Sequence, residues 1–285
     1  MAYPTARADF RAPRADDFSR HGVVLTWDEY IAWLTGRKKW HLVGGRRIRL
    51  PPPWKPGQHW ALIGKTREGK TNFAVVMLIA TRKYVLAIDP KGEDETLTAS
   101  GWTRVHSVPG GRYQPRRYSR EWRLWEDLWK RIEAGEDVRI VVGLPTRTQA
   151  DDEANKQLMS DAVEFTRTSR GWTLLVDEHQ VATDPRMYRI GPQVARMAVS
   201  AASAKTSVMT TMQYLSWSEK APVRQASFIS IWKTRNKDLL RRLSDETGRD
   251  WQELGQIVDE LGKYDMVTIC DDVRAPVIVT RPPKL

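Results

Sequence analysis

The chain has a single cysteine, Cys270, among its 285 residues. One cysteine can form neither an internal disulfide nor a cysteine-based zinc cluster, so it fits a reducing compartment and most simply fills space in a strand. The sequence also lacks an apolar run approaching the roughly 18 residues of a membrane-spanning helix, and its first 20 residues lack the apolar core of a secretory signal. We therefore expect a soluble, cytoplasmic protein without membrane insertion.

Acidic residues are too few to balance the basic ones. Lysine and arginine total 46 against 35 aspartates and glutamates, which gives a formal net charge of +11. This excess favours a polyanionic partner, either nucleic acid or an anionic membrane surface, and charge alone does not choose between them. The length suffices for one large α/β domain with small additions.

The two ends of the chain differ in character. We predict a flexible, basic N-terminal arm over residues 1–46 that contains one short helix, Trp27–Leu34, capped by Thr26 and ended by Gly36. Prolines in PPPWKPG stiffen the approach to the first core strand. Residues 47–285 are predicted to form the main domain, which closes with a hairpin of the segments YDMVTIC and APVIVT.

From residue 59 onward, short apolar strands alternate with helices. Strands are predicted at His59–Ile63, Tyr84–Asp89 and Val138–Gly143, and in the segments GWTLLVDEHQ, TSVMTTMQ and ASFISIW. Continuously apolar strands separated by helices predict an α/β fold, with a mostly parallel central sheet and helices on both faces.

The stretch GKTREGKT matches the phosphate-loop pattern G-x-x-x-x-G-K-[ST], between the strand His59–Ile63 and a predicted helix Lys70–Thr81. In such a loop, backbone N–H groups turn toward phosphate oxygens and the helix N-terminus adds partial positive charge. Lys70 would reach the β- and γ-phosphates and the Thr71 hydroxyl would ligate Mg²⁺. The alternative is a glycine-containing turn before a helix. The predicted nucleotide-binding residues are Gly64, Lys65, Thr66, Arg67, Glu68, Gly69, Lys70 and Thr71.

Two further polar signals stand at strand ends. Asp177 and Glu178 end the strand in WTLLVDE, at the edge of a parallel sheet where ligands bind. Asp177 would join the Mg²⁺ shell, and Glu178 would polarise a water for attack on the γ-phosphate; an acidic turn is the alternative. Gln213 ends TSVMTTMQ, where its amide could touch both γ-phosphate and water, although a surface glutamine is the commoner case.

The order of GKTREGKT, IDPKGED, LLVDEHQ, VMTTMQ and FISIWKTRNKDLLRRLSDETG resembles the FtsK/HerA/VirD4 superfamily of DNA-pumping ATPases, over roughly residues 47–270. The combination of an Asp-Pro-Lys-Gly turn, an Asp-Glu strand end and a glutamine on the next core strand carries the resemblance. It implies a RecA-like ATPase core that uses ATP and Mg²⁺ and forms a homo-oligomeric ring, a pentamer or hexamer, around double-stranded DNA. It also implies a recruiting protein, such as a portal or a relaxase.

The resemblance places Lys70 and Thr71 on phosphate and magnesium, Asp177 and Glu178 on metal and water, and Gln213 as a sensor. It further implies an arginine that acts on a neighbouring subunit. Arg196 is our choice, with Arg186, Arg189 and Arg235 as rivals. The chain departs from the family pattern at SAASAKTS, where members usually carry a Gly-Arg pair, and at Arg67 and Glu68, where residues are often small.

Two basic segments are candidates for DNA contact. Gly111–Trp125 interleaves the arginines Arg112, Arg116, Arg117, Arg120 and Arg123 with the aromatic residues Tyr113, Tyr118, Trp122 and Trp125, a pattern typical of phosphate contact and base packing. The alternative is an exposed loop before an amphipathic helix whose tryptophans face the core. Arg37–Arg49, which contains Lys38 and Lys39, is the second candidate; a solvated basic face is its alternative.

These observations predict an ATP- and Mg²⁺-dependent DNA-translocating motor subunit of the viral genome-packaging or mobile-element type, which would make the protein cytoplasmic or virus-associated. Three other classes stay open. They are the cytoplasmic ATPase of a secretion or conjugation machine, a phosphate-loop kinase or small-molecule NTPase that does not act on DNA, and a non-enzymatic nucleotide-gated adaptor.

Overall fold

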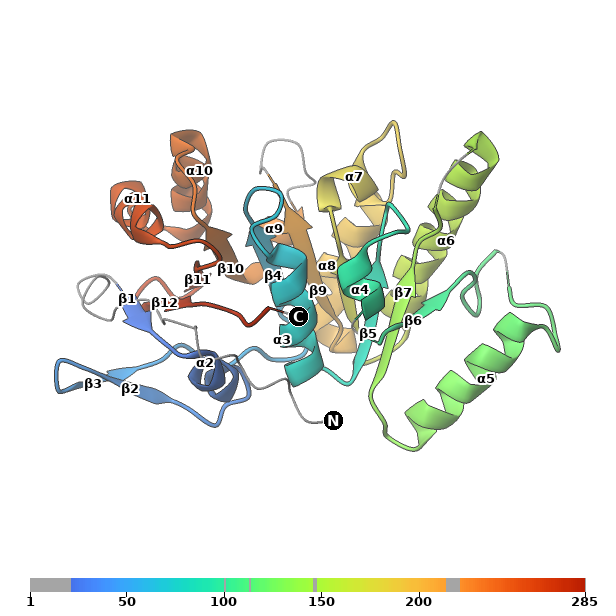
Figure 1. Ribbon diagram of the computed structural model, residues 1–285, viewed down its shortest axis with the longest axis horizontal. Coiled ribbons are helices and arrows are strands. Elements are labelled where there is room, and N and C mark those ends of the chain that lie inside the picture. The colour runs from blue at the N-terminus through green and yellow to red at the C-terminus, as the bar shows by residue number, and fades with distance from the viewer. Residues whose placement is uncertain (1–21, 100, 113, 146–147, 214–220, 285) are drawn as a thin grey trace.

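The computed structural model describes residues 22–99, 101–112, 114–145, 148–213 and 221–284. Ten of its strands form one sheet: β1 (Gly22–Val24), β4 (His59–Ile63), β5 (Tyr84–Ile88), β6 (Thr103–Val105), β7 (Val138–Val142), β8 (Thr173–Val176), β9 (Ser207–Met212), β10 (Ala226–Trp232), β11 (Met266–Cys270) and β12 (Val277–Thr280). Their order across the sheet is β1-β12-β11-β10-β4-β9-β8-β5-β7-β6 (Figure 1). Two more strands, β2 (Trp40–Val43) and β3 (Arg46–Arg49), pair separately as a hairpin.

Seven of the nine neighbouring pairs in the large sheet are parallel. The exceptions are β10 with β11 and β11 with β12, which run antiparallel. The mostly parallel sheet and the C-terminal hairpin are therefore confirmed.

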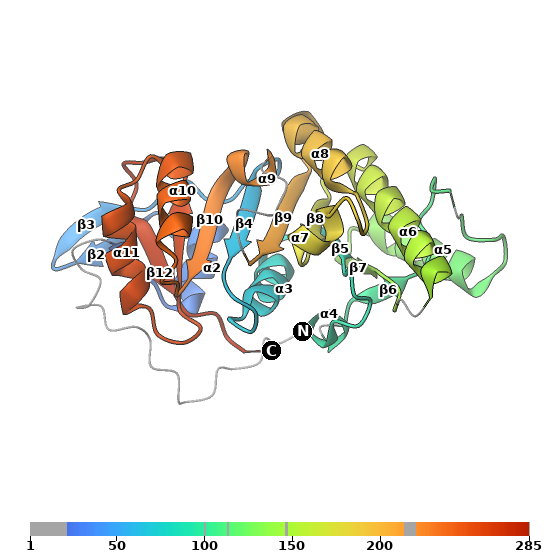
Figure 2. The same ribbon diagram turned by 90° about the horizontal axis from the view of Figure 1, so that it is seen from above.

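Helices cover both faces of the sheet (Figure 2). They are α2 (Trp27–Leu34), α3 (Lys70–Thr81), α4 (Glu95–Ala99), α5 (Arg120–Glu133), α6 (Gln149–Thr168), α7 (His179–Thr183), α8 (Gly191–Ala204), α9 (Ala221–Arg224), α10 (Lys237–Thr247) and α11 (Trp251–Glu260). α3 and α4 lie on one side of the sheet and α6 and α8 on the other. No helix in the described part of the chain combines the length and the apolar character that crossing a membrane requires.

The central strand β4 shows how the sheet is stabilised from both sides. Trp60 and Leu62 pack into a core shared with α2 and α3, whereas Ala61 and Ile63 pack into a core shared with α10 and α11. Because successive side chains of a strand point to opposite faces, a strand covered on both sides must be apolar at every position. This requirement explains the continuous apolar runs of the sequence.

The described part of the expected N-terminal arm is built into the same core. β1 pairs in parallel with β12, and α2 is capped by Thr26, which forms a capping box with Glu29. The Tyr30 and Trp33 side chains of this helix are buried, and the Tyr30 hydroxyl lies 2.8 Å from Thr268 Oγ1 of β11. Residues 1–21 lie outside the described residues. From residue 22 onward, the segment closes one edge of the sheet and belongs to the main fold.

Candidate active site

The strands that carry the predicted site end at one edge of the sheet. β4, β9, β8 and β5 are parallel neighbours, so the residues that follow them emerge side by side. The phosphate loop (Gly64–Thr71) follows β4, and Asp177 and Glu178 follow β8. In a parallel sheet this edge is the usual position of a ligand site.

The phosphate loop leads directly into α3. Gly69 precedes the helix with φ = 92°, a left-handed conformation that costs glycine little. Lys70 begins the helix and is 9% exposed, and its amine donates a 2.7 Å hydrogen bond to the carbonyl of Lys65, across the loop. Burial lowers the pKa of the Lys70 amine. An ammonium group held across the loop and partly removed from water is well placed for phosphate oxygens.

Asp177 lies at the centre of a hydroxyl cluster. Its Oδ1 accepts hydrogen bonds from Thr71 Oγ1 at 3.0 Å and from Thr211 Oγ1 at 2.7 Å. The side chain is buried, and this burial raises the pKa of the Asp177 carboxyl to about 6. The carboxyls of Asp94 and Glu178 raise it further, while the two hydroxyls oppose the shift.

This donor set fits Mg²⁺. A buried carboxyl whose ionised form is penalised by burial gains most from a nearby cation, and carboxylate and hydroxyl oxygens are the ligands that Mg²⁺ prefers, together with substrate phosphates. Thr71 lies at the N-terminus of α3 and Asp177 at the end of β8, so the Thr71 hydroxyl and the Asp177 carboxylate oxygen lie 3.0 Å apart. These two residues would hold the ion, which when bound would neutralise charge on the phosphates.

Glu178 has an unusual backbone and an ionic partner. Its φ and ψ are 44° and 52°, in the left-handed region, and its N–H donates to Thr211 Oγ1 at 2.9 Å. Lys91 donates from Nζ to Glu178 Oε1 at 2.6 Å. Residues other than glycine rarely adopt this backbone conformation, and where they do, they are often at functional sites. The predicted catalytic carboxylate is thus held from both its backbone and its side chain.

A hydrogen-bonded turn after β5 holds the backbone of Lys91 in position. The buried Asp89 carboxylate accepts hydrogen bonds from the N–H groups of Lys91, Gly92 and Asp94 and forms an ion pair of 3.0 Å with Arg104. Gly92 has φ = 71°, and a Cβ there would lie 2.2 Å from the backbone of Leu144. The Asp-Pro-Lys-Gly sequence therefore has a physical basis, because the aspartate organises the turn and the glycine permits it to pack closely.

Gln213 follows β9 beside the phosphate loop. Its N–H donates to Gln180 Oε1 at 3.1 Å, and the preceding residue, Met212, accepts from the Gly64 N–H at 3.1 Å. The residue predicted to sense nucleotide is therefore joined by its backbone to α7, the helix that follows the acids. Its role as a sensor stays a prediction.

The candidate arginines lie in three places. Arg196 is exposed on α8, close enough to Glu164 of α6 to lower the pKa of that carboxyl together with Arg167, which has the larger effect. Arg186 and Arg189 are exposed on the loop between α7 and α8. Arg235 lines a pocket next to the phosphate loop of its own chain, which makes it a poorer candidate for action on a neighbouring subunit.

The two basic segments are far apart. Arg112, Arg116, Arg117 and Arg120 are exposed in and before α5, near the β6 edge of the sheet, whereas the β2–β3 hairpin lies at the opposite end (Figure 1). Trp125 is buried and Trp122 is half-buried, as the amphipathic-helix alternative predicts, while Tyr113 lies outside the described residues. Lys38 is paired with Glu29 at 2.9 Å, and Lys39 is exposed. One chain therefore does not bring the two segments onto a common surface.

Three residues of the site were missed by sequence reasoning. Thr211 donates a hydrogen bond to Asp177. Gln180 accepts one from the Gln213 N–H at the end of β9, and Lys91 pairs with Glu178. Lys91 had a usable signal, because it follows a predicted strand that ends at the same edge. Thr211 had none, since a threonine in an apolar strand is ordinary.

Solved structures share this fold. The genome packaging NTPase B204 from Sulfolobus turreted icosahedral virus 2, in complex with sulfate, is 15% identical over 80% of this chain and 98% of its own, with a TM-score of 0.51. In complex with AMPPCP, the same NTPase is 14% identical over 80% of this chain and 100% of its own, with a TM-score of 0.50. VirB4 of Thermoanaerobacter pseudethanolicus is 11% identical over 80% of this chain and 89% of its own, with a TM-score of 0.53.

Identities this low show the fold alone. The chain has the α/β fold of a genome packaging NTPase and of VirB4, and at the level of the fold the resemblance predicted from the sequence is confirmed. No protein-family model matches the sequence, and no curated protein matches it either.

Proposed function

We propose that the chain is an ATP- and Mg²⁺-dependent DNA-translocating motor subunit that works as a homo-oligomeric ring around double-stranded DNA. The observation that carries the proposal is the meeting of Lys70, Thr71, Asp177 and Glu178 at one sheet edge. In this proposal Lys70 binds phosphate, Thr71 and Asp177 hold Mg²⁺, and Glu178 accepts a proton from the attacking water. The fold shared with a genome packaging NTPase supports it.

A ring is proposed because the site needs a further positive charge. Phosphoryl transfer leaves charge on the transferred group, and an arginine from a neighbouring subunit can accelerate the reaction by several powers of ten. A closed cyclic assembly also provides a central channel, where basic residues attract phosphates without reading sequence. The net charge of +11 fits such a partner.

The test is the ATPase rate per subunit, measured against protein concentration, with and without long double-stranded DNA, at low and moderate salt. The proposal predicts a rate that rises with assembly and with DNA and whose DNA stimulation weakens with salt. Glu178→Gln serves as the blank, since it should bind ATP but hydrolyse it at least about 10²-fold more slowly. A constant rate that DNA leaves unchanged would contradict the proposal and favour a small-molecule NTPase.

A further inference from the structure

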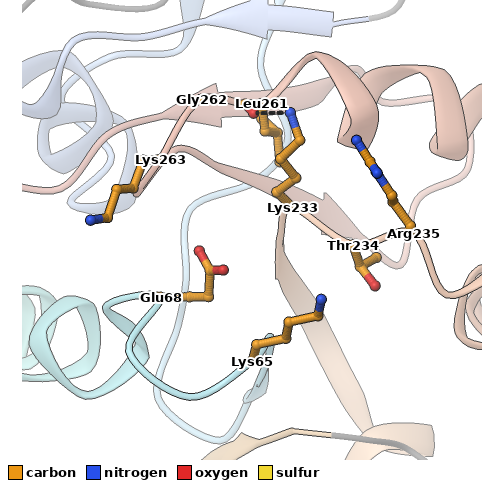
Figure 3. A pocket seen from close by; sticks show the side chains of 8 residues that line it. All are labelled: Lys65, Glu68, Lys233, Thr234, Arg235, Leu261, Gly262 and Lys263. Atoms are coloured by element: carbon orange, nitrogen blue, oxygen red, sulfur yellow. Dashed lines mark hydrogen bonds between the residues drawn. The ribbon is translucent and has the colours of Figure 1, made fainter.

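The phosphate loop has two sides, and they differ in chemistry. On the side of β8 and β9 lie Asp177, Thr211 and the Lys91–Glu178 pair. On the side of β10 and β11 lies a pocket of about 390 Å³ (Figure 3). It is lined by residues of the phosphate loop, of the segment after β10 and of the segment before β11, namely Lys65, Glu68, Lys233, Thr234, Arg235, Leu261, Gly262 and Lys263.

Only one of these sides remains for the nucleoside of a bound nucleotide. If Thr71 and Asp177 hold the metal and Glu178 faces the phosphate that is cleaved, the terminal phosphate lies on the β8 and β9 side. The rest of the molecule must then leave the loop on the β10 and β11 side. The pocket there carries a carboxylate, Glu68, and a hydroxyl, Thr234, among its basic side chains. Such mixed donors and acceptors suit a ribose and base better than a bare anion.

An exposed aromatic ring completes this side. Tyr264 directly follows the last lining residue and is 42% exposed, and its Cδ1 lies 3.6 Å from the position that a Cβ on Gly69 would occupy. The ring therefore stands against the glycine at which the phosphate loop becomes α3. The Lys263 amine lies 5.0 Å from the ring centroid.

The segment before β11 holds the ring at this position. Tyr264 has φ = 70°, a left-handed conformation that is unfavourable for a residue with a Cβ. Asp265 accepts a 2.9 Å hydrogen bond from the Gly262 N–H and forms an ion pair with Arg281. These interactions fix the backbone on either side of Tyr264, whose exposed ring can therefore serve as a surface on which a base stacks.

We propose that Tyr264 and the adjoining pocket form the nucleoside subsite of this chain, with the base of the nucleotide stacked on the Tyr264 ring. The inference rests on the proposed nucleotide-binding function, and it adds the residue that binds the base. Stacking of a base on an aromatic side chain tolerates different bases, so the platform contributes affinity for nucleotides over inorganic phosphates.

The test compares two ligands by calorimetry on the full chain with Mg²⁺. A non-hydrolysable ATP analogue reports both parts of the site, and inorganic tripolyphosphate reports the phosphate loop alone. Tyr264→Gly removes the ring while glycine keeps φ = 70° without steric cost. We expect about 5- to 100-fold weaker binding of the ATP analogue and unchanged binding of tripolyphosphate. Tyr264→Phe should keep the affinity of the wild-type chain.

The chain offers a matched control in Tyr118. It is an exposed tyrosine with φ = 64°, and the Arg117 guanidinium lies 5.1 Å from its ring centroid. Tyr118 belongs to the candidate DNA-contact segment Gly111–Trp125, and the titrations contain no DNA, so Tyr118→Gly should leave both affinities unchanged. Equal affinity of the wild-type chain for the two ligands, or an equal loss of both in Tyr264→Gly, would overturn the nucleoside subsite and leave the phosphate site standing. Binding of neither ligand by the wild-type chain would contradict the proposed function itself.

Discussion

Lys91 Nζ lies 2.6 Å from Glu178 Oε1, and this pair joins the turn after β5 to the end of β8. The Glu178 side chain is 21% exposed and that of Lys91 is 66% exposed, so the amine can move into solvent at little cost. The Lys91 amine donates to Glu178 Oε1, so this oxygen already accepts a hydrogen bond from a cation. In this arrangement the predicted catalytic base is engaged rather than available to a water molecule.

The pair predicts the effect of Lys91→Met. Removing the amine frees the Glu178 carboxylate, so we expect DNA-independent ATP turnover to rise several-fold. A steady-state ATPase assay without DNA measures this, with Lys156→Met as the control, because Lys156 pairs with Glu153 on α6, away from the site. Adding Glu178→Gln should abolish the gain. A fall in turnover after Lys91→Met would instead assign Lys91 to the binding of phosphate.

Asp177 predicts a pH dependence of stability in the metal-free protein. Its pKa is about 6 in the fold against a reference value of 3.8, so the folded state binds the proton more tightly than the unfolded state. Its contribution is therefore present below about pH 4 and is lost as the pH rises through about 6. Relative to the wild type, Asp177→Asn should gain roughly 3 kcal/mol between pH 4 and pH 8. Urea unfolding in the presence of a chelator measures the free energy of unfolding of both proteins at each pH. A difference between the two proteins that does not change with pH would contradict the prediction.

Tyr30 predicts how strongly the N-terminal segment is bound to the core. Its hydroxyl lies 2.8 Å from Thr268 Oγ1, which lies 2.9 Å from Ser230 Oγ, and all three residues are buried. Tyr30→Phe should lower the free energy of unfolding by about 1–2 kcal/mol, because the Thr268 hydroxyl loses a partner in the core. Tyr84→Phe is the control, since that hydroxyl makes a 3.4 Å bond at a half-buried position. Equal losses in the two variants would refute the assignment.

The exposed arginines near α5 predict the salt dependence of DNA binding. Replacing Arg116, Arg117 and Arg120 with alanine should weaken binding and reduce the slope of log K against log salt by about three. Lys38→Ala should change the slope less, because Glu29 already neutralises that amine. Fluorescence anisotropy over a salt series measures both slopes. An unchanged slope in the triple variant would move the DNA contact elsewhere.

The arginine supplied to a neighbouring site is tested by mixing subunits. Glu178→Gln lacks the predicted base, and Arg196→Ala lacks the predicted arginine, so each alone should be inactive. A mixture should regain activity, because a subunit with an intact base can receive an arginine from its neighbour. Arg186→Ala and Arg189→Ala, on the loop after α7, are mixed in the same way. A variant that shows no recovery at any ratio is excluded as the source of the arginine.

The sequence by itself determined the local parts of this protein. The helix over Lys70–Thr81, the strand His59–Ile63 and the Thr26 cap agree residue by residue with the structure. Each depends on neighbouring residues, namely glycines before a helix, an apolar run of strand length and a threonine three residues before a glutamate. The parallel character of the sheet followed in the same way, from apolar strands separated by helices.

Only the tertiary structure decided which residues meet. β8 lies between β5 and β9, and this order alone brings Lys91 to Glu178 and Thr211 to Asp177 across 87 and 34 residues. It also placed Tyr264 against Gly69 and drew the three-residue strand β1 into the sheet. Such contacts depend on the packing of surfaces distant in the sequence, which no local periodicity encodes. The phosphate-loop motif can thus be predicted from the chain, whereas the residues that contact it depend on the complete fold.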